Sequence, residues 1–265
     1  MKSKGYKKYL YDIRKEMFLV IFFQVFILVF LIGLWQVLVD NNVINSFITS
    51  SPKNILNTIL DLYHSNNLFN HIWVTIYETF ISFSIGTILG IIIAIIMWCN
   101  RFISKVIDPY LTILNSLPKV SLGPILIIWV GANINSIIVM ALLISLIITI
   151  INVYNGFNST DINKIKLLTS FGATKMQILR YLVLPSNYPI IISSLKINVS
   201  MSLIGVIMGE LLVSKQGIGY LIMYGSQVFN LDLVMTGIVI LMITSYLMYI
   251  IINKLEKILI KNLVN

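Results

Sequence analysis

The sequence predicts an all-α integral membrane protein with six transmembrane helices and both termini in the cytoplasm. Charged residues make up only 11% of the 265 residues and hydrophobic residues 58%, with a mean hydropathy of +0.92. Soluble domains carry about a quarter charged residues, and a soluble fold would need a polar surface that this composition cannot supply. The basic residues also fall in blocks between long apolar runs, which is typical of membrane proteins.

Six apolar runs have the length of membrane spans. The expected spans cover residues 17–39, 73–98, 106–130, 137–154, 189–212 and 233–252. The first run is too long for the apolar region of a signal peptide and lacks a cleavage site, so we expect a retained helix. The third run contains Pro109, Pro118 and Pro124. Prolines are tolerated in a span where neighbours or water satisfy the freed carbonyls, so this broken span either lines a pathway or forms a packed kink.

The distribution of basic residues orients the chain. Fifteen of the 19 Lys and Arg residues lie in the segments that are cytoplasmic if the N-terminus is inside, whereas the outer loops hold Lys53 and Lys215. The net charge of +9 therefore reflects orientation, and we expect contact with membrane lipid and not with nucleic acid. The expected organisation is a basic cytoplasmic segment 1–16, a first helix with an extracytoplasmic loop 17–71, a core 72–252 containing a cytoplasmic loop 155–188, and a basic tail 253–265.

The chain offers no chemistry of its own for metal or nucleotide binding. It has one cysteine and two histidines, and no Cys/His cluster has metal-ligand spacing, so no metal site is expected. The phosphate-binding pattern G-x-x-x-x-G-K-[ST] is absent. We therefore expect no catalytic residue and no cofactor in this chain.

Small and polar residues recur along two of the spans. Close helix packing in lipid depends on small residues, and the four-residue spacing predicts packing faces at Ser82, Gly86, Gly90 and Ala94 and at Gly205 and Gly209. A second group is polar, ionisable or helix-breaking, and it either lines a pathway or forms helix interfaces: Glu78, Pro118, Pro124, Ser194, Lys196, Asn198, Ser202 and Glu210. Glu78 and Glu210 are expected near the outer ends and Lys196 near the inner end, where each can extend to the membrane surface.

The cytoplasmic loop 155–188 contains an amphipathic pattern. It predicts two short helices separated at Gly172, which we expect in a left-handed conformation, with Pro185 ending the second helix. One apolar edge comprises Leu167, Leu168 and Phe171, and the other comprises Met176, Leu179 and Leu182 or Val183. These residues leave open whether the loop binds a partner protein or lies flat on the membrane.

The spacing Gly172, nine residues, Leu182, one residue, Leu184-Pro185 resembles the coupling-loop motif of ABC importer permeases, the binding-protein-dependent inner-membrane components. That motif is written EAA, three residues, G, nine residues, I, one residue, LP, and it lies between the fourth and fifth of six spans, as here. The resemblance covers most of the chain and is closest to the nitrate/sulfonate/taurine-type branch. Lys166 stands at the motif's glutamate, Leu167 and Leu168 replace its alanines, and Glu78 stands where many relatives have a basic residue.

The resemblance implies a type I ABC importer permease in the bacterial plasma membrane. Its implied partners are a second copy of this permease, two copies of an ATP-binding cassette subunit that hold ATP and Mg, and an extracytoplasmic solute-binding protein. The implied solute is a small anion such as nitrate, a sulfonate or taurine, or a vitamin precursor such as a pyrimidine. The residues implied in ATPase coupling are Lys166, Leu167, Leu168, Phe171, Gly172, Ala173, Leu182, Leu184 and Pro185. The alternative is an ion-coupled secondary transporter, which predicts midplane carboxylates and inverted repeats; the sequence shows neither.

Overall fold

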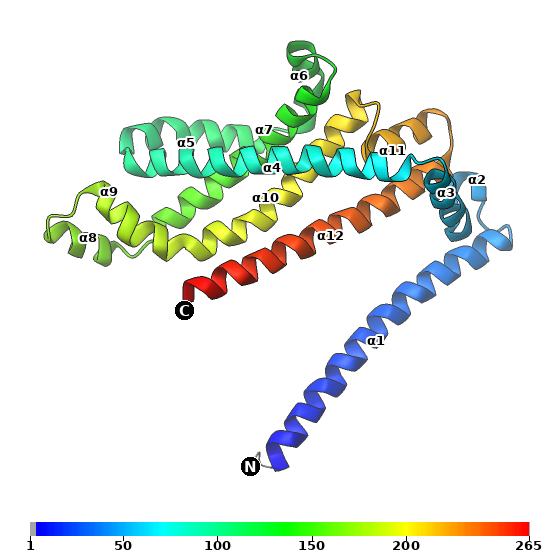
Figure 1. Ribbon diagram of the computed structural model, residues 1–265, viewed down its shortest axis with the longest axis horizontal. Helices are drawn as coiled ribbons and strands as arrows, with labels where there is room; N and C mark the ends of the chain where they lie inside the picture. Colours follow the sequence, from blue (N-terminus) through cyan, green and yellow to red (C-terminus); the bar gives the residue numbers. More distant parts are fainter. Residues whose placement is uncertain (1–3, 265) are drawn as a thin grey trace.

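The computed structural model describes residues 4–264, and this part of the chain is helical throughout, without a strand (Figure 1). Residues 1–3 of the predicted basic segment and Asn265 of the predicted tail lie outside the described residues. The elements are α1 Lys4–Asp40, α2 Ser46–Thr49, α3 Pro52–His64, α4 Leu68–Cys99, α5 Arg101–Ser116, η1 Lys119–Leu122, α6 Gly123–Val130, α7 Ile134–Asn158, α8 Ile162–Ser170, α9 Lys175–Ile178, η2 Leu179–Val183, α10 Leu184–Val213, α11 Ile218–Gln227 and α12 Leu231–Val264.

The predicted all-helical membrane fold is confirmed. Five helical segments are long and apolar enough to cross a membrane. The pair α5 and η1–α6 passes the same test together, is bent by 94°, and brings the number to six if it is counted as one span. The bend lies at Leu117 and Pro118, both in extended conformation. Pro109 lies inside α5 and Pro124 in the first turn of α6, so neither of these two prolines breaks a helix.

Helix α7 packs between α4 and α10, and both stripes of small residues face it. A Cβ atom added at Gly86 would lie 2.6 Å from Ser145 Oγ, and one at Gly90 would lie 2.6 Å from Thr149 Cγ2. On the other side, a Cβ atom at Gly205 would lie 2.4 Å from the Cα of Ala141. The absence of side chains at these positions lets three helices approach closely where lipid provides no hydrophobic drive.

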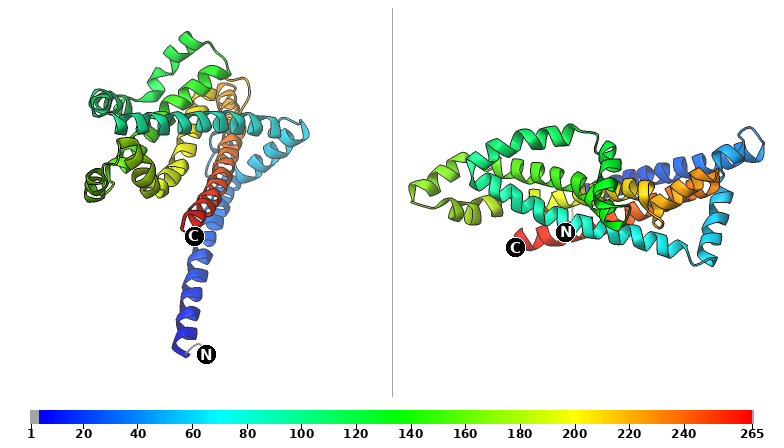
Figure 2. Two further views of the ribbon diagram at one scale, coloured as in Figure 1. Left: turned by 60° about the vertical axis from the view of Figure 1, so that its left-hand side comes forward. Right: turned by 90° about the horizontal axis from the view of Figure 1, so that it is seen from above.

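Helix α1 diverges from the rest of the chain (Figures 1 and 2). None of its most apolar 18-residue window is buried, and it is joined to the remainder through α2 and α3. The backbone N–H of Lys53 donates to Gln36 Oε1 at 3.0 Å across this junction. Four phenylalanines at four-residue spacing stack along one face of α1, and they are Phe18, Phe22, Phe26 and Phe30.

Candidate functional site

The loop 155–188 forms a hairpin of two short helical segments at the end of the bundle where α4 and α7 end (Figure 1). Asp161 caps α8 by accepting the N–H of Asn163 at 2.8 Å. Gly172 then reverses the chain with φ of +79°, the left-handed conformation that the sequence predicts. Thr174 and Gln177 form a capping box that begins α9.

The expectation that Pro185 ends the second helix is wrong. The segment from Lys175 continues through the π-helical turn η2 directly into α10, and Pro185 lies in the first turn of α10. The N–H of Leu184 bonds to the carbonyl of Leu179, five residues back. A proline ring normally clashes with the carbonyl four residues earlier, and the wider π turn relieves that clash. The second half of the loop is therefore a rigid extension of a membrane span.

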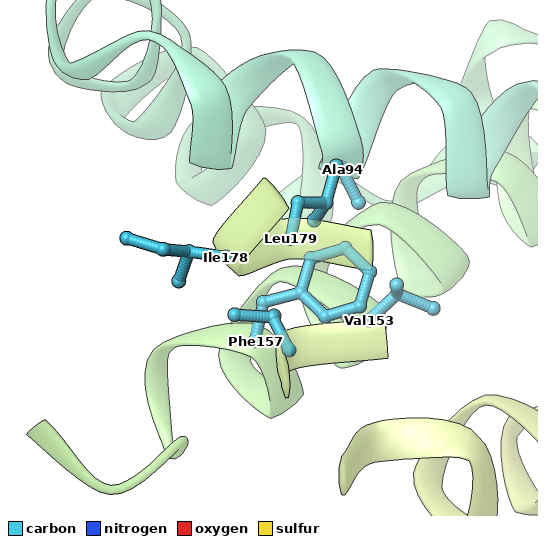
Figure 3. Packing of buried hydrophobic residues seen from close by; sticks show 6 residues of the cluster. Ala94, Val153, Phe157, Ile178 and Leu179 are labelled. Carbon is cyan, nitrogen blue, oxygen red and sulfur yellow. The ribbon is translucent and has the colours of Figure 1, made fainter. Parts of the chain in front are cut away.

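The apolar edge of this second half is buried in the bundle. Ile178, Leu179 and Val183 are 4%, 3% and 0% exposed and pack against Ala94 of α4 and Val153 and Phe157 of α7 (Figure 3). Around this cluster pack Leu168, Ala173, Leu182 and Leu184. Lys175 Nζ donates to the carbonyl of Cys99 at 3.1 Å. Met176, expected in the same edge, is instead 62% exposed.

The first edge is largely open. Leu167 is 56% and Phe171 78% exposed, and α8 contains no buried residue. Lys166, at the position of the motif glutamate, is exposed as well. The first half of the hairpin thus exposes apolar side chains, whereas the second half is packed against α4 and α7. We call Leu167 and Phe171 the exposed edge of α8.

The opposite end of the bundle holds a buried polar cluster that fixes the start of α11. The N–H of Gly217 donates to His71 Nδ1 at 3.0 Å, and the N–H of Ile218 donates to Thr75 Oγ1 at 2.9 Å. Glu210 accepts from Thr75 Oγ1 at 2.6 Å and from the N–H of Gly219 at 2.6 Å. A carboxylate that accepts backbone N–H groups at a helix start stabilises that start. The sequence did not identify His71 or Thr75 as part of this site, although they lie eleven and seven residues before Ser82 and therefore on the same side of α4.

The ionisable residues do not extend to the membrane surface as expected. Glu78 and Glu210 are 2% and 1% exposed and lie next to each other, because both face inward at the end of the helix interfaces around α7. Lys196 forms an ion pair with Glu256 of α12. The hydrogen bonds of Glu210 and the ion pair of Lys196 hold segments of this chain together.

The remaining polar candidates also lie between helices or on the surface. Ser194, Asn198 and Ser202 are buried, and the Asn198 amide donates to the Thr87 hydroxyl, joining α10 to α4. Pro118 and Pro124 are exposed on the bent pair. Within this chain the stripe on α10 forms a helix interface, whereas the bent pair presents an open surface.

The chain is similar to known transport proteins in sequence and in fold. Residues 86–264, more than half of the chain, match the family described as "Binding-protein-dependent transport system inner membrane component". The formylaminopyrimidine transport permease protein ThiX of Halalkalibacterium halodurans is 30% identical, with 80% of this chain and 85% of the relative aligned. The taurine transport system permease protein TauC of Escherichia coli is 21% identical, over 86% and 84% of the two chains. A chain of a bacterial ABC transporter involved in the import of the acidic polysaccharide alginate has the same fold, with a TM-score of 0.63 at 14% identity over 94% of this chain and 98% of that one.

Proposed function

This chain belongs to the family of binding-protein-dependent transport system inner membrane components and is an ABC importer permease subunit, and from this premise we propose how it is driven and supplied. An ATP-binding subunit, holding ATP and Mg, docks on the exposed edge of α8 at the cytoplasmic side. An extracytoplasmic binding protein delivers the solute to the other end. The working unit contains two copies of this chain and lies in the bacterial plasma membrane.

The observation that carries the proposal is the contrast between the two halves of the hairpin. Leu179 and Val183 are buried against α4 and α7, whereas Phe171 is 78% exposed. A force applied to α8 is therefore transmitted through η2 into α10 and through the Ala94 contact into α4. Rigid-body movement of packed helices is a common way to switch between two openings, and this connection supports such a lever.

A second copy is supported by the surface of the bent pair. Asn115, Ser116 and Ser121 are exposed there, and Lys119 Nζ bonds to the carbonyl of Asn115 at 2.9 Å. Polar side chains and irregular backbone at membrane depth occur where protein or a watery cavity covers them, and not against lipid. A pathway between two copies provides such a cover.

The solute that we propose is a small polar organic molecule. The named relatives include a formylaminopyrimidine permease and a taurine permease, which supports a small vitamin precursor or sulfonate as the transported class. The family resemblance implied these classes together with nitrate.

Replacing Phe171 by alanine tests the docking of the ATP-binding subunit. Because Phe171 is 78% exposed in this chain, its removal should leave the permease folded. Loss of an aromatic anchor at an interface typically costs about 2 kcal/mol or more, which weakens binding roughly 30-fold at about 1.4 kcal/mol per factor of ten. The measurement is the amount of ATP-binding subunit that co-purifies with a tagged permease.

The matched control is Phe47→Ala, because Phe47 is 67% exposed on α2 at the predicted outer side. It should retain the ATP-binding subunit at the wild-type level. Equal retention by Phe171→Ala and the wild type would instead mean that α8 is a connector lying on the membrane.

A further inference from the structure

A cavity of about 560 Å³ opens at the predicted outer end of the bundle, between α4, the α6–α7 loop and the α10–α11 loop. Its lining includes Trp73, Tyr77, Glu78, Asn133, Lys215 and Gln216. Cavities of about 300–1,000 Å³ are typical for small-molecule sites. One wall is held in place by the bonds from His71, Thr75 and Glu210 to residues 217–219.

Glu78 is the unsatisfied group of this cavity. Its side chain is 2% exposed, and its Oε2 atom has no hydrogen-bond donor among the described residues. The neighbouring Glu210 differs, since its two oxygens accept from Thr75 and Gly219. Among the residues that the structure describes, no Lys, Arg or His forms an ion pair with either carboxylate. A buried carboxylate requires a positive charge or hydrogen-bond donors, and the neighbour that the structure places beside Glu78 is a second carboxyl group, that of Glu210.

The rest of the lining indicates which group would complete the site. Trp73 is 66% and Tyr77 48% exposed in the same cavity, and the faces of such rings attract organic cations. A Ca²⁺ ion takes about six to eight oxygen ligands, whereas no cluster of three metal-ligating side chains occurs in the described part of the chain. An anion would be repelled by the negative charge of the Glu78 carboxylate.

We propose that this cavity recognises a small solute through a protonated amine, with the ammonium group bound to Glu78 and flanked by Trp73 and Tyr77. This inference rests on the proposed transport function and specifies the class of solute. The solute is then an amine or a zwitterion, and its acidic end, where it has one, faces the exposed Lys215 at the rim.

The test measures binding of three small probes to the full-length permease in lipid nanodiscs by saturation-transfer NMR. Ethylamine and β-alanine, which carry an ammonium group, should bind, and propionate should not. Glu78→Gln should reduce ethylamine binding at least tenfold. Trp73→Ala should also weaken it, and because Trp73 is largely exposed this variant tests the site even if Glu78→Gln does not fold. Lys53→Gln is the control, because Lys53 is exposed on α3 outside this cavity, and it should leave ethylamine binding intact.

Three results would overturn the proposal. One is equal binding of propionate and ethylamine. Another is the absence of ethylamine binding to the wild type, as expected if the two carboxylates merely share a proton. The third is unchanged binding in both the Glu78 and the Trp73 variants. Co-purification of the ATP-binding subunit is measured in the same preparations, and its retention shows that the proposed function stands whichever way the cavity result falls.

Discussion

Replacing Gly172 by valine should uncouple ATP hydrolysis from transport while leaving the permease inserted in the membrane. Gly172 has φ of +79°, and a Cβ atom there would meet nothing within 4 Å. The penalty is therefore purely conformational, about 1–2 kcal/mol for a side chain in the left-handed region. The α9 side of the turn is fixed by Ile178 and Leu179, so relief of the strain should displace α8, which has no buried residue.

The readout is ATP hydrolysis and solute uptake in proteoliposomes that contain the ATP-binding subunit and the binding protein. Gly172→Val should lose either the ATP-binding subunit or the stimulation of hydrolysis by solute-loaded binding protein. Gly172→Asn is the matched control, because asparagine tolerates the left-handed conformation, and it should remain coupled. If valine supports normal uptake, the position of α8 does not control coupling.

Replacing the buried Gly205 by alanine should destabilise the bundle more than the same replacement of a glycine on its surface. The added Cβ would lie 2.4 Å from the Cα of Ala141 and 3.2 Å from its backbone nitrogen. Overpacking typically costs about 1–3 kcal/mol and occasionally more, and a backbone contact cannot be relieved by a side-chain rotation. We therefore expect a loss of folding stability at the upper end of this range and a clearly lower unfolding temperature of the purified protein.

Two further variants make this prediction specific. Gly33 lies in α1, and a Cβ atom there would meet nothing within 4 Å, so Gly33→Ala should leave the unfolding temperature unchanged. Adding Ala141→Gly to Gly205→Ala should restore little stability, because the closest atom belongs to the backbone. Full recovery in the double variant would show that α7 and α10 pack less closely than described.

The span pattern could be predicted because apolar length and basic blocks are properties of the sequence alone. The stripes at Gly86 and Gly205 could be identified as packing faces by their spacing. Spacing cannot show that both contact α7, because the identity of a small residue does not indicate which helix packs against it. The continuation through Pro185 was missed because it depends on the π turn formed by the preceding residues.

The carboxylates were placed at the right end of the helices and in the wrong environment. Hydropathy and the distribution of basic residues predict that Glu78 and Glu210 lie near the outer ends, but they do not reveal donors from other segments. Thr75 and Gly219 bond to Glu210 and lie 135 and 9 residues away along the chain. Only the three-dimensional arrangement separates a buried anchor from a side chain that extends to the surface.

The most direct test of the account is native mass spectrometry of the complex purified from membranes through a tag on this chain. We expect an assembly with two copies of this chain and two copies of an ATP-binding subunit, as required if each exposed edge of α8 docks one ATP-binding subunit and the polar surface of α5 and η1 faces a second copy. A chain that is isolated as a single copy, or without any ATP-binding subunit under conditions that preserve membrane complexes, would contradict the account.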